Sequence, residues 1–195
     1  QKELLNFKND IIKKEFSDAS EFLKNYIDYS IAPIEEACFS NHHYQYKKYF
    51  SGNIMYSHPM YMSYFEAYFK QYLKQLSLKP KGVDLFNEIN EMHSYSNALS
   101  TILKVDTLLK NDTLRELILL SGLREWYYQK DNNRNNISLL MNYISLKALS
   151  TQNRIIAANL LQDMNALDAG SAAPEMLLNH PKYKSIADLK GNYVY

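Results

Sequence analysis

The chain has 195 residues, and its 22 Lys and Arg residues nearly balance its 21 Asp and Glu residues, for a net charge of +1. This balance argues against a nucleic-acid-binding protein, and a hydrophobic fraction of 46% argues against a disordered chain. No apolar run approaches the roughly 18 residues of a membrane span. Gly and Pro are scarce, at five each, which favours long helices, and the 17 tyrosines suggest rings in the core with hydroxyls at its edge.

Helical periodicity extends over the chain up to residue 168 and predicts an all-α protein. We expect about eight helices, joined by short connections as a bundle or a stacked array. The expected helices lie near residues 1–16, 18–34, 57–76, 83–93, 94–103, 113–129, 137–149 and 151–167. The stretch 40–57 is ambiguous, with 44–50 as a further candidate helix.

The second expected helix begins at the capping-box pattern Asp18-Ala-Ser-Glu21. Pro33 lies inside this helix and predicts a kink or a break. The inward face should carry Phe22, Tyr26, Ile27, Ile31 and Ile34.

A long helix should begin at Ser57-His58-Pro59, because proline suits the first helical turn, and run to about Leu76. Its spacing predicts one aromatic face that serves core packing rather than base stacking. The residues of this face are Met60, Tyr64, Phe65, Tyr68, Tyr72 and Leu76.

Polar residues of the other expected helices are interpreted as caps or solvated faces. Thr113-Leu-Arg-Glu116 matches a second capping box. The acidic pairs Glu35-Glu36 and Glu88/Glu91 are interpreted as solvated helix faces. Asn111 and Asn136 match the N-glycosylation pattern and are interpreted as residues at or near helix starts.

Cys38, His42 and His43 are the candidate metal ligands, since Cys and His four residues apart would share a helix face. A structural zinc site needs four ligands, so His58 or His93 would have to join them. The alternative is a small buried thiol beside solvent-facing histidines, and it is the favoured one. Cys38 is also the only cysteine, which excludes an intrachain disulfide. As a nucleophile with His42 as its base, it would lack a visible oxyanion hole. We therefore predict no catalytic, cofactor-binding or metal-binding residue.

The end of the chain differs from the helices before it. Gly170-Ser-Ala-Ala-Pro174, Ser185-Ile-Ala-Asp-Leu-Lys-Gly191 and the β-prone Tyr193-Val-Tyr195 follow one another there. This order resembles the opening of a TlpA-like thioredoxin-fold domain, as found in bacterial envelope thiol–disulfide oxidoreductases. Met176-Leu-Leu178 and Asn179-His-Pro-Lys182 depart from the usual pattern.

Two helical blocks, Ile54 to Leu73 and Leu108 to Tyr128, are similar to the helical region that precedes the thioredoxin domain in a group of multidomain envelope proteins. The resemblance implies a helical accessory domain at 1–168 and the truncated start of a thioredoxin-like domain at 169–195. It also implies a periplasmic or cell-envelope location and a protein substrate or partner.

The redox chemistry of such proteins depends on Cys-x-x-Cys after the central strand, and this chain has no such pattern. We therefore expect the chain to position a redox domain without itself catalysing exchange, while its tail favours self-association. The alternative is a stand-alone helical protein with a Tyr/Met-lined groove for a peptide or an apolar ligand.

Overall fold

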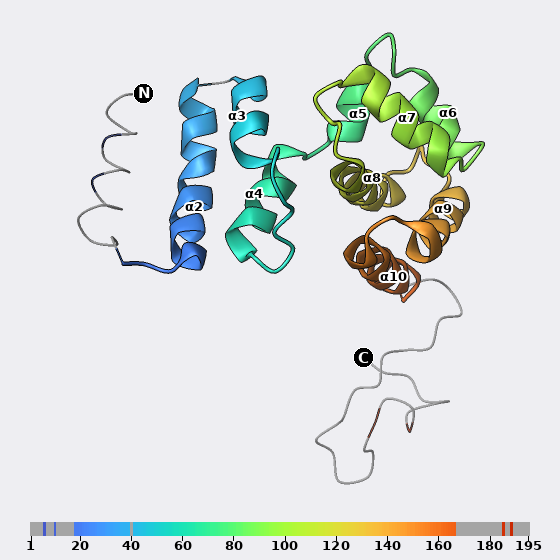
Figure 1. The fold of residues 1–195 in the computed structure, drawn as a ribbon. Helices are drawn as coiled ribbons and strands as arrows, with labels where there is room; N and C mark the ends of the chain where they lie inside the picture. Colours follow the sequence, from blue (N-terminus) through green and yellow to red (C-terminus); the bar gives the residue numbers. More distant parts are fainter. Residues whose placement is uncertain are drawn as a thin grey trace.

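The computed structural model describes residues 18–39 and 41–166, together with the single positions Asn6, Asp10, Ser185 and Asp188 (Figure 1). All regular elements of the two described ranges are helices, which confirms the all-α prediction. In chain order they are α2 (Glu21–Phe39), α3 (His42–Tyr49), α4 (Pro59–Tyr68), α5 (Tyr72–Ser77), α6 (Asp84–Asn90), α7 (Tyr95–Val105), α8 (Asp112–Tyr127), α9 (Arg134–Lys147) and α10 (Thr151–Asn165).

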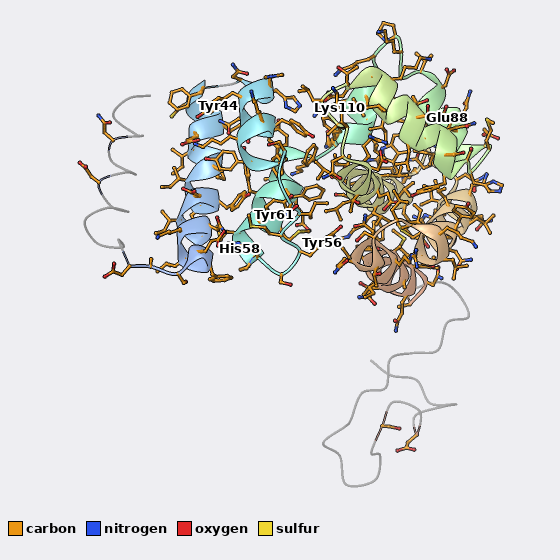
Figure 2. The ribbon with its side chains drawn as sticks, viewed as in Figure 1. Tyr44, Tyr56, His58, Tyr61, Glu88 and Lys110 are labelled. Carbon is orange, nitrogen blue, oxygen red and sulfur yellow. The ribbon has the colours of Figure 1, made fainter. Side chains whose placement is uncertain are left out.

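The helices form two lobes that lie side by side (Figure 1). The N-terminal lobe consists of α2, α3 and α4, in which α2 packs against both other helices. The C-terminal lobe consists of α5 to α10. Residues 69–71 join α4 to α5, and Tyr56 lies between the lobes, where its hydroxyl donates to Asn153 Oδ1 at 2.8 Å (Figure 2).

The core of the N-terminal lobe is aromatic. Phe50 stacks on Tyr64 with ring centroids 5.3 Å apart, and the Tyr29 ring meets Tyr61 edge-on at 5.0 Å. Offset and edge-on arrangements are those that aromatic quadrupoles favour. Three helices therefore suffice to bury a core, because each ring removes a large apolar area from water.

The core of the C-terminal lobe is aliphatic and is centred on α8. This helix packs against α5, α7, α9 and α10, and it is buried on nearly all sides. Its central residues 117–120 are all apolar and buried, so they present apolar side chains on every side of the helix, as is typical of a helix in the interior. Its fully buried aliphatic residues are Leu114, Ile118, Leu119, Leu120 and Leu123.

Pro33 does not break α2, and the inward face of this helix differs from the one expected. The helix continues without a break past Pro33, whose ring lies exposed while Ala32 and Glu35 on either side are buried. Packing against α3 and α4 holds the helix together where proline removes a hydrogen bond. The inward face is also different: Tyr29, Ala32 and Glu35 are buried. Three residues expected inside are exposed, namely Phe22 at 56%, Tyr26 at 41% and Ile34 at 52%.

The long helix expected over 57–76 is two helices, because Gln71 adopts a left-handed backbone with φ of 54°. The start of α4 is as expected: His58 is the N-cap and Pro59 the first helical residue. The aromatic face is confirmed for Tyr64, Phe65 and Tyr72, all of them buried. With this division and with α3, the described ranges hold nine helices, close to the expected number.

Several helix starts are set by local side chains. The Ser20 hydroxyl accepts from Leu23 N at 3.3 Å, so Ser20 rather than Asp18 caps α2. Asn111 caps α8 by accepting from Leu114 N at 3.1 Å. Thr113 and Glu116 therefore do not form the expected capping box, since α8 begins at Asp112.

The expected first helix (1–16) and the expected domain start (169–195) lie outside the described residues, apart from the four single positions. Asn6 and Asp10 are helical and exposed. Ser185 N donates to Asp188 Oδ2 at 3.0 Å, and Asp188 N donates to Ser185 O at 3.2 Å. These two residues of the tail motif therefore form a turn.

Candidate functional site

An open groove lies between α4 of the N-terminal lobe and α8 of the C-terminal lobe. It has a volume of about 680 Å³. Most of the side chains that line it belong to polar residues, and they carry charges of both signs. The residues that line it are Ser63, Glu66, Ala67, Lys70, Gln71, Ser121, Arg124, Glu125, Tyr128 and Gln129.

Gln71 is the strained point of this groove. A left-handed backbone costs roughly 1–2 kcal/mol for a residue with a side chain. The Glu125 carboxylate holds the conformation by accepting from Gln71 N at 2.9 and 3.2 Å. Because Gln71 precedes α5, Glu125 also places a negative charge at a helix N-terminus, where the helix dipole favours it. Strain of this kind often accompanies a binding site or a hinge.

The groove offers both signs of charge at short range. Lys70 and Arg124 are exposed, as is Glu66, so a ligand with a carboxylate and a basic group would find partners for both. Exposed pairs of this kind give orientation more than affinity. The exposed ring of Tyr128 adds an apolar platform at one end. The groove therefore offers a peptide both charged partners and some apolar surface.

The predicted Tyr/Met lining is absent from this groove, since it contains one tyrosine and no methionine. The tyrosines of α4 lie inside the N-terminal lobe instead. Tyr61 and Tyr64 are each 1% exposed. Burial is the largest influence on both hydroxyls, and it raises the pKa of Tyr61 and of Tyr64 above the usual value.

Cys38, His42 and His43 are close in sequence but do not form a metal centre. Cys38 is exposed at the end of α2, and both histidines are exposed on the first turn of α3. Within the described ranges, no three His, Cys, Asp or Glu side chains are grouped so that they could hold a metal ion. The expected buried thiol is therefore an exposed one.

The other two histidines that could have joined them are used elsewhere. His58 Nδ1 accepts from Tyr61 N at 3.3 Å, and its Nε2 lies 3.2 Å from Phe22 O. These partners assign the proton to Nε2, because a carbonyl can only accept. His93 lies in an exposed loop with a positive φ of 39°.

His42 takes part in a smaller crevice of about 300 Å³, which is lined by residues of α2, α3, α4 and α5. The Tyr68 hydroxyl contacts His42 Nδ1 and donates to His42 O at 2.9 Å. Burial, followed by the charge of Glu36, raises the pKa of Tyr68 above its usual value. Tyr68 therefore stays protonated at neutral pH and serves as a hydrogen-bond donor.

Glu116 of α8 organises a buried polar network that the sequence did not reveal. Its Oε1 accepts from the Tyr95 hydroxyl and from Leu149 N at 2.8 Å, and its Oε2 accepts from Asn153 Nδ2 at 3.0 Å. The residue is fully buried. This one carboxylate therefore connects α7, α8 and α10. A signal was present: Glu116 shares a helix face with Leu119, Leu120 and Leu123.

Glu35 and Glu88 correct a second prediction, because neither lies on a solvated face. Glu35 is 1% exposed and accepts from Lys48 Nζ at 2.6 Å and from the Tyr49 hydroxyl at 2.7 Å. Glu88 is buried and accepts from the Thr101 hydroxyl at 2.8 Å. Each therefore links two helices, α2 with α3 and α6 with α7.

The interpretation of Asn111 and Asn136 as residues at helix starts is confirmed. Asn111 caps α8, and Asn136 lies in the first turn of α9. The Asn136 amide donates to Asn90 O at 2.5 Å, so this side chain already has a structural role.

No protein-family model matches the chain, and neither a curated protein nor a solved structure matches it. The fold and the groove define a class, a two-lobed helical protein with a polar inter-lobe groove. None of the helices in the described part of the chain is both long enough and apolar enough to cross a membrane.

Proposed function

We propose that residues 18–166 are a scaffold that positions a thioredoxin-like domain beginning near Gly170, in an envelope thiol–disulfide oxidoreductase. The observation that carries the proposal is the anchoring of α10, the helix that leads into the Gly170 motif. A domain attached to an anchored helix is held in one orientation, whereas a flexible linker would let it move freely.

Both ends of α10 are tied to the body of the C-terminal lobe. Near its start, Asn153 donates to Glu116 Oε2 and to Thr113 O, each at 3.0 Å. Near its end, Met164 is buried and its carbonyl accepts from the Tyr127 hydroxyl at 3.3 Å. The axis of α10 therefore follows the axis of α8.

The chemistry of this proposal belongs to a Cys-x-x-Cys pair outside residues 1–195. In thiol–disulfide exchange, a thiolate attacks one sulfur of a substrate disulfide and forms a mixed disulfide. The second thiol then displaces the substrate, which leaves reduced by two electrons, while the Cys-x-x-Cys pair becomes the disulfide. The helical residues position this pair and do not enter the reaction.

The first test is the coding sequence that follows Tyr195, where we expect Cys-x-x-Cys shortly after the β-prone Tyr193-Val-Tyr195. An insulin-reduction assay should give turnover with the protein extended through that motif and none with residues 1–195. Turnover by residues 1–195 would contradict the proposal, as would an extended reading frame that lacks the motif.

A second test measures the positioning itself. Spin labels on α10 and on the thioredoxin-like domain of the extended protein should give a narrow distance distribution. Asn153→Ala should broaden it, because the start of α10 loses its bonds to α8, whereas exposed Gln152→Ala should leave it unchanged. A distribution that is equally broad in all three proteins would show that α10 does not position the domain.

The proposal also includes association through the tail, since the β-prone Tyr193-Val-Tyr195 would offer unpaired backbone groups if it became a strand of a thioredoxin-like sheet. Light scattering on residues 1–195 and on residues 1–169 should give a larger mass for the longer chain. Equal masses would remove the tail as a cause of association.

The groove between α4 and α8 favours a second candidate function, the binding of a polar peptide. Titration with a mixed library of charged peptides should perturb NMR signals of Gln71 and Tyr128. Arg124→Ser should weaken the binding, whereas Arg154→Ser on the surface of α10 should not. Equal binding by both variants would exclude the groove as the site.

A further inference from the structure

We propose that the crevice beside His42 binds a small quaternary ammonium group between its aromatic rings and the Glu36 carboxylate. This inference does not depend on the proposed function. The crevice has a volume of about 300 Å³, at the lower end of the roughly 300–1,000 Å³ of small-molecule sites, so its ligand must be small. Its lining residues are Glu36, Asn41, His42, Tyr68, Tyr72 and Gln75.

Three aromatic rings, those of His42, Tyr68 and Tyr72, form part of the lining. The centroid of the His42 ring lies 4.8 Å from that of Tyr68 and 6.1 Å from that of Tyr72. The His42 ring is inclined by 78° and 79° to these two rings, so it stands nearly at right angles to both. An aromatic face attracts a cation within about 6 Å of the ring centroid, which places a cation in a crevice this small within reach of more than one ring.

The charge at the crevice is negative. Glu36 is its only lining residue of the Asp, Glu, Lys and Arg types, and it forms no ion pair with any residue of the two described ranges. A second carboxylate is adjacent, since Asp106 Oδ2 accepts from the Tyr72 hydroxyl. Burial raises the pKa of Tyr68, and the charges of Glu36 and Asp106 raise it further, so both carboxylates act on the crevice. This field attracts a cation and repels an anion.

The lining suits a quaternary ammonium better than a metal ion or a primary ammonium. Among the residues that the structure describes, no three His, Cys, Asp or Glu side chains are grouped so that they could hold a metal ion. A primary ammonium has three N–H donors to satisfy. Glu36 is the only carboxylate that lines the crevice, and Asn41 Oδ1 already accepts from Tyr44 N at 3.0 Å. A quaternary ammonium has no N–H group, so aromatic rings and one carboxylate are sufficient for it.

The crevice lies at the junction of the two lobes, because Tyr68 ends α4 and Tyr72 begins α5. Glu36 and His42 belong to the N-terminal lobe, so a bound cation would contact both lobes. A ligand that binds only the folded state raises its stability by mass action. Binding at this crevice should therefore stabilise the folded arrangement of the lobes.

Titration of the full chain with tetramethylammonium chloride, followed by NMR, tests the proposal. The signals of His42, Tyr68 and Tyr72 should shift and reach saturation. Ammonium chloride should bind at least about tenfold more weakly, because its ion lacks the methyl groups that contact the rings. Sodium chloride at the same ionic strength should give no saturable shift. Absence of saturation with tetramethylammonium, or equal binding of ammonium, would overturn the proposal.

Matched variants identify the groups that hold the cation. Glu36→Gln should weaken the binding of tetramethylammonium about tenfold by removing the counter-charge, whereas Glu21→Gln at the exposed start of the same helix should leave it unchanged. His42→Ala should weaken it about threefold or more, since one ring is lost, whereas His43→Ala in the same exposed turn of α3 should not. Equal effects within either pair would exclude the crevice as the site.

The melting temperature gives a second readout that needs no assignment of NMR signals. Saturating tetramethylammonium chloride should raise it relative to the same concentration of sodium chloride. Glu36→Gln should abolish this increase, and Glu21→Gln should retain it. An equal increase in both variants would contradict the proposal, since the cation would then act on the protein surface at large rather than in the crevice.

Discussion

The two lobes solve the same packing problem with different side chains. The N-terminal lobe has three described helices and builds its core from tyrosine and phenylalanine rings, whereas the C-terminal lobe has six helices and builds its core from leucine and isoleucine. A buried ring removes about 150–250 Å² from water, so few helices suffice where rings are used. As a consequence, tyrosine hydroxyl groups enter the core of the N-terminal lobe. Burial disfavours the ionised form of each hydroxyl, and a buried hydroxyl without a hydrogen-bond partner costs stability.

Alkaline pH should produce the largest difference in stability between the two lobes. Burial, with a smaller effect from Asp28, raises the pKa of Tyr29 to about 12 from the usual 10. In the unfolded chain this tyrosine ionises near pH 10, while in the folded lobe it stays protonated. The free energy of unfolding is therefore unaffected below pH 10 and falls as the pH rises from 10 through 12. Burial also raises the pKa of Tyr49 and of Tyr64 in the same lobe.

We accordingly expect tyrosinate absorbance and loss of near-ultraviolet circular dichroism to appear together between pH 10 and 12. Trp126, the only tryptophan, reports on the C-terminal lobe by its fluorescence and should respond at higher pH. Titration of all tyrosines near pH 10 in a fully folded protein would contradict the expected burial.

In the C-terminal lobe, the largest loss should follow removal of the Glu116 carboxylate. Glu116→Ala leaves the Tyr95 hydroxyl, Leu149 N and the Asn153 amide without their acceptor, at a cost of about 3–5 kcal/mol in the free energy of unfolding. Glu116→Gln keeps one acceptor oxygen and should cost less. Urea unfolding measures both, with exposed Glu66→Ala as the control. A loss for Glu116→Ala no larger than for Glu66→Ala would exclude the network as a major source of stability.

Packing between α5 and α8 should be the next most sensitive feature. A Cβ atom at Gly122 would lie 2.3 Å from the Cγ and Cδ1 atoms of Leu73, so Gly122→Ala should destabilise the protein by about 1–3 kcal/mol through overpacking. Gly52→Ala should be tolerated, since nothing lies within 4 Å of the added atom.

A double-mutant cycle checks the cause of the Gly122→Ala effect. In the background of Leu73→Ala the clash is relieved, and the further cost of Gly122→Ala should be much smaller. An unchanged cost would show that backbone conformation at Gly122, rather than contact with Leu73, makes glycine necessary there.

Removing a tyrosine hydroxyl from the aromatic core should change stability in a direction that depends on whether the hydroxyl has a hydrogen-bond partner. The Tyr49 hydroxyl donates to Glu35, so Tyr49→Phe should cost about 1 kcal/mol. The Tyr61 hydroxyl is buried with no partner among the described residues, so Tyr61→Phe should be neutral or slightly stabilising. Thermal melts of the two matched variants decide the point, and equal losses would mean that both hydroxyls are satisfied.

The smallest effect should come from the junction between the lobes. Gln71→Gly removes the strain of the left-handed backbone while keeping the N–H that Glu125 accepts from, so it should stabilise the protein by up to about 1 kcal/mol. Lys70→Gly, in the preceding turn, is the control and should not stabilise. A loss of stability in Gln71→Gly would show that the glutamine side chain itself is needed.

Features that depend on local interactions could be predicted from the sequence, whereas features that depend on distant residues could not. The start of α4 was predictable because His58 and Pro59 act on the turn that contains them. The division between α4 and α5 was not predictable, since the Gln71 conformation is held by Glu125, which lies 54 residues away. The groove between α4 and α8 depends on that division and could not have been found either.

The sequence by itself determined the all-α class, most of the helix starts and the aromatic nature of the first lobe, because propensity, capping and periodicity act within a few residues. Tertiary structure alone decided which charged side chains are buried. Glu35, Glu88 and Glu116 fit solvated faces or caps when considered locally. Each became buried because a neighbouring helix supplied donors, namely Lys48 and Tyr49 for Glu35, Thr101 for Glu88, and Tyr95 and Asn153 for Glu116.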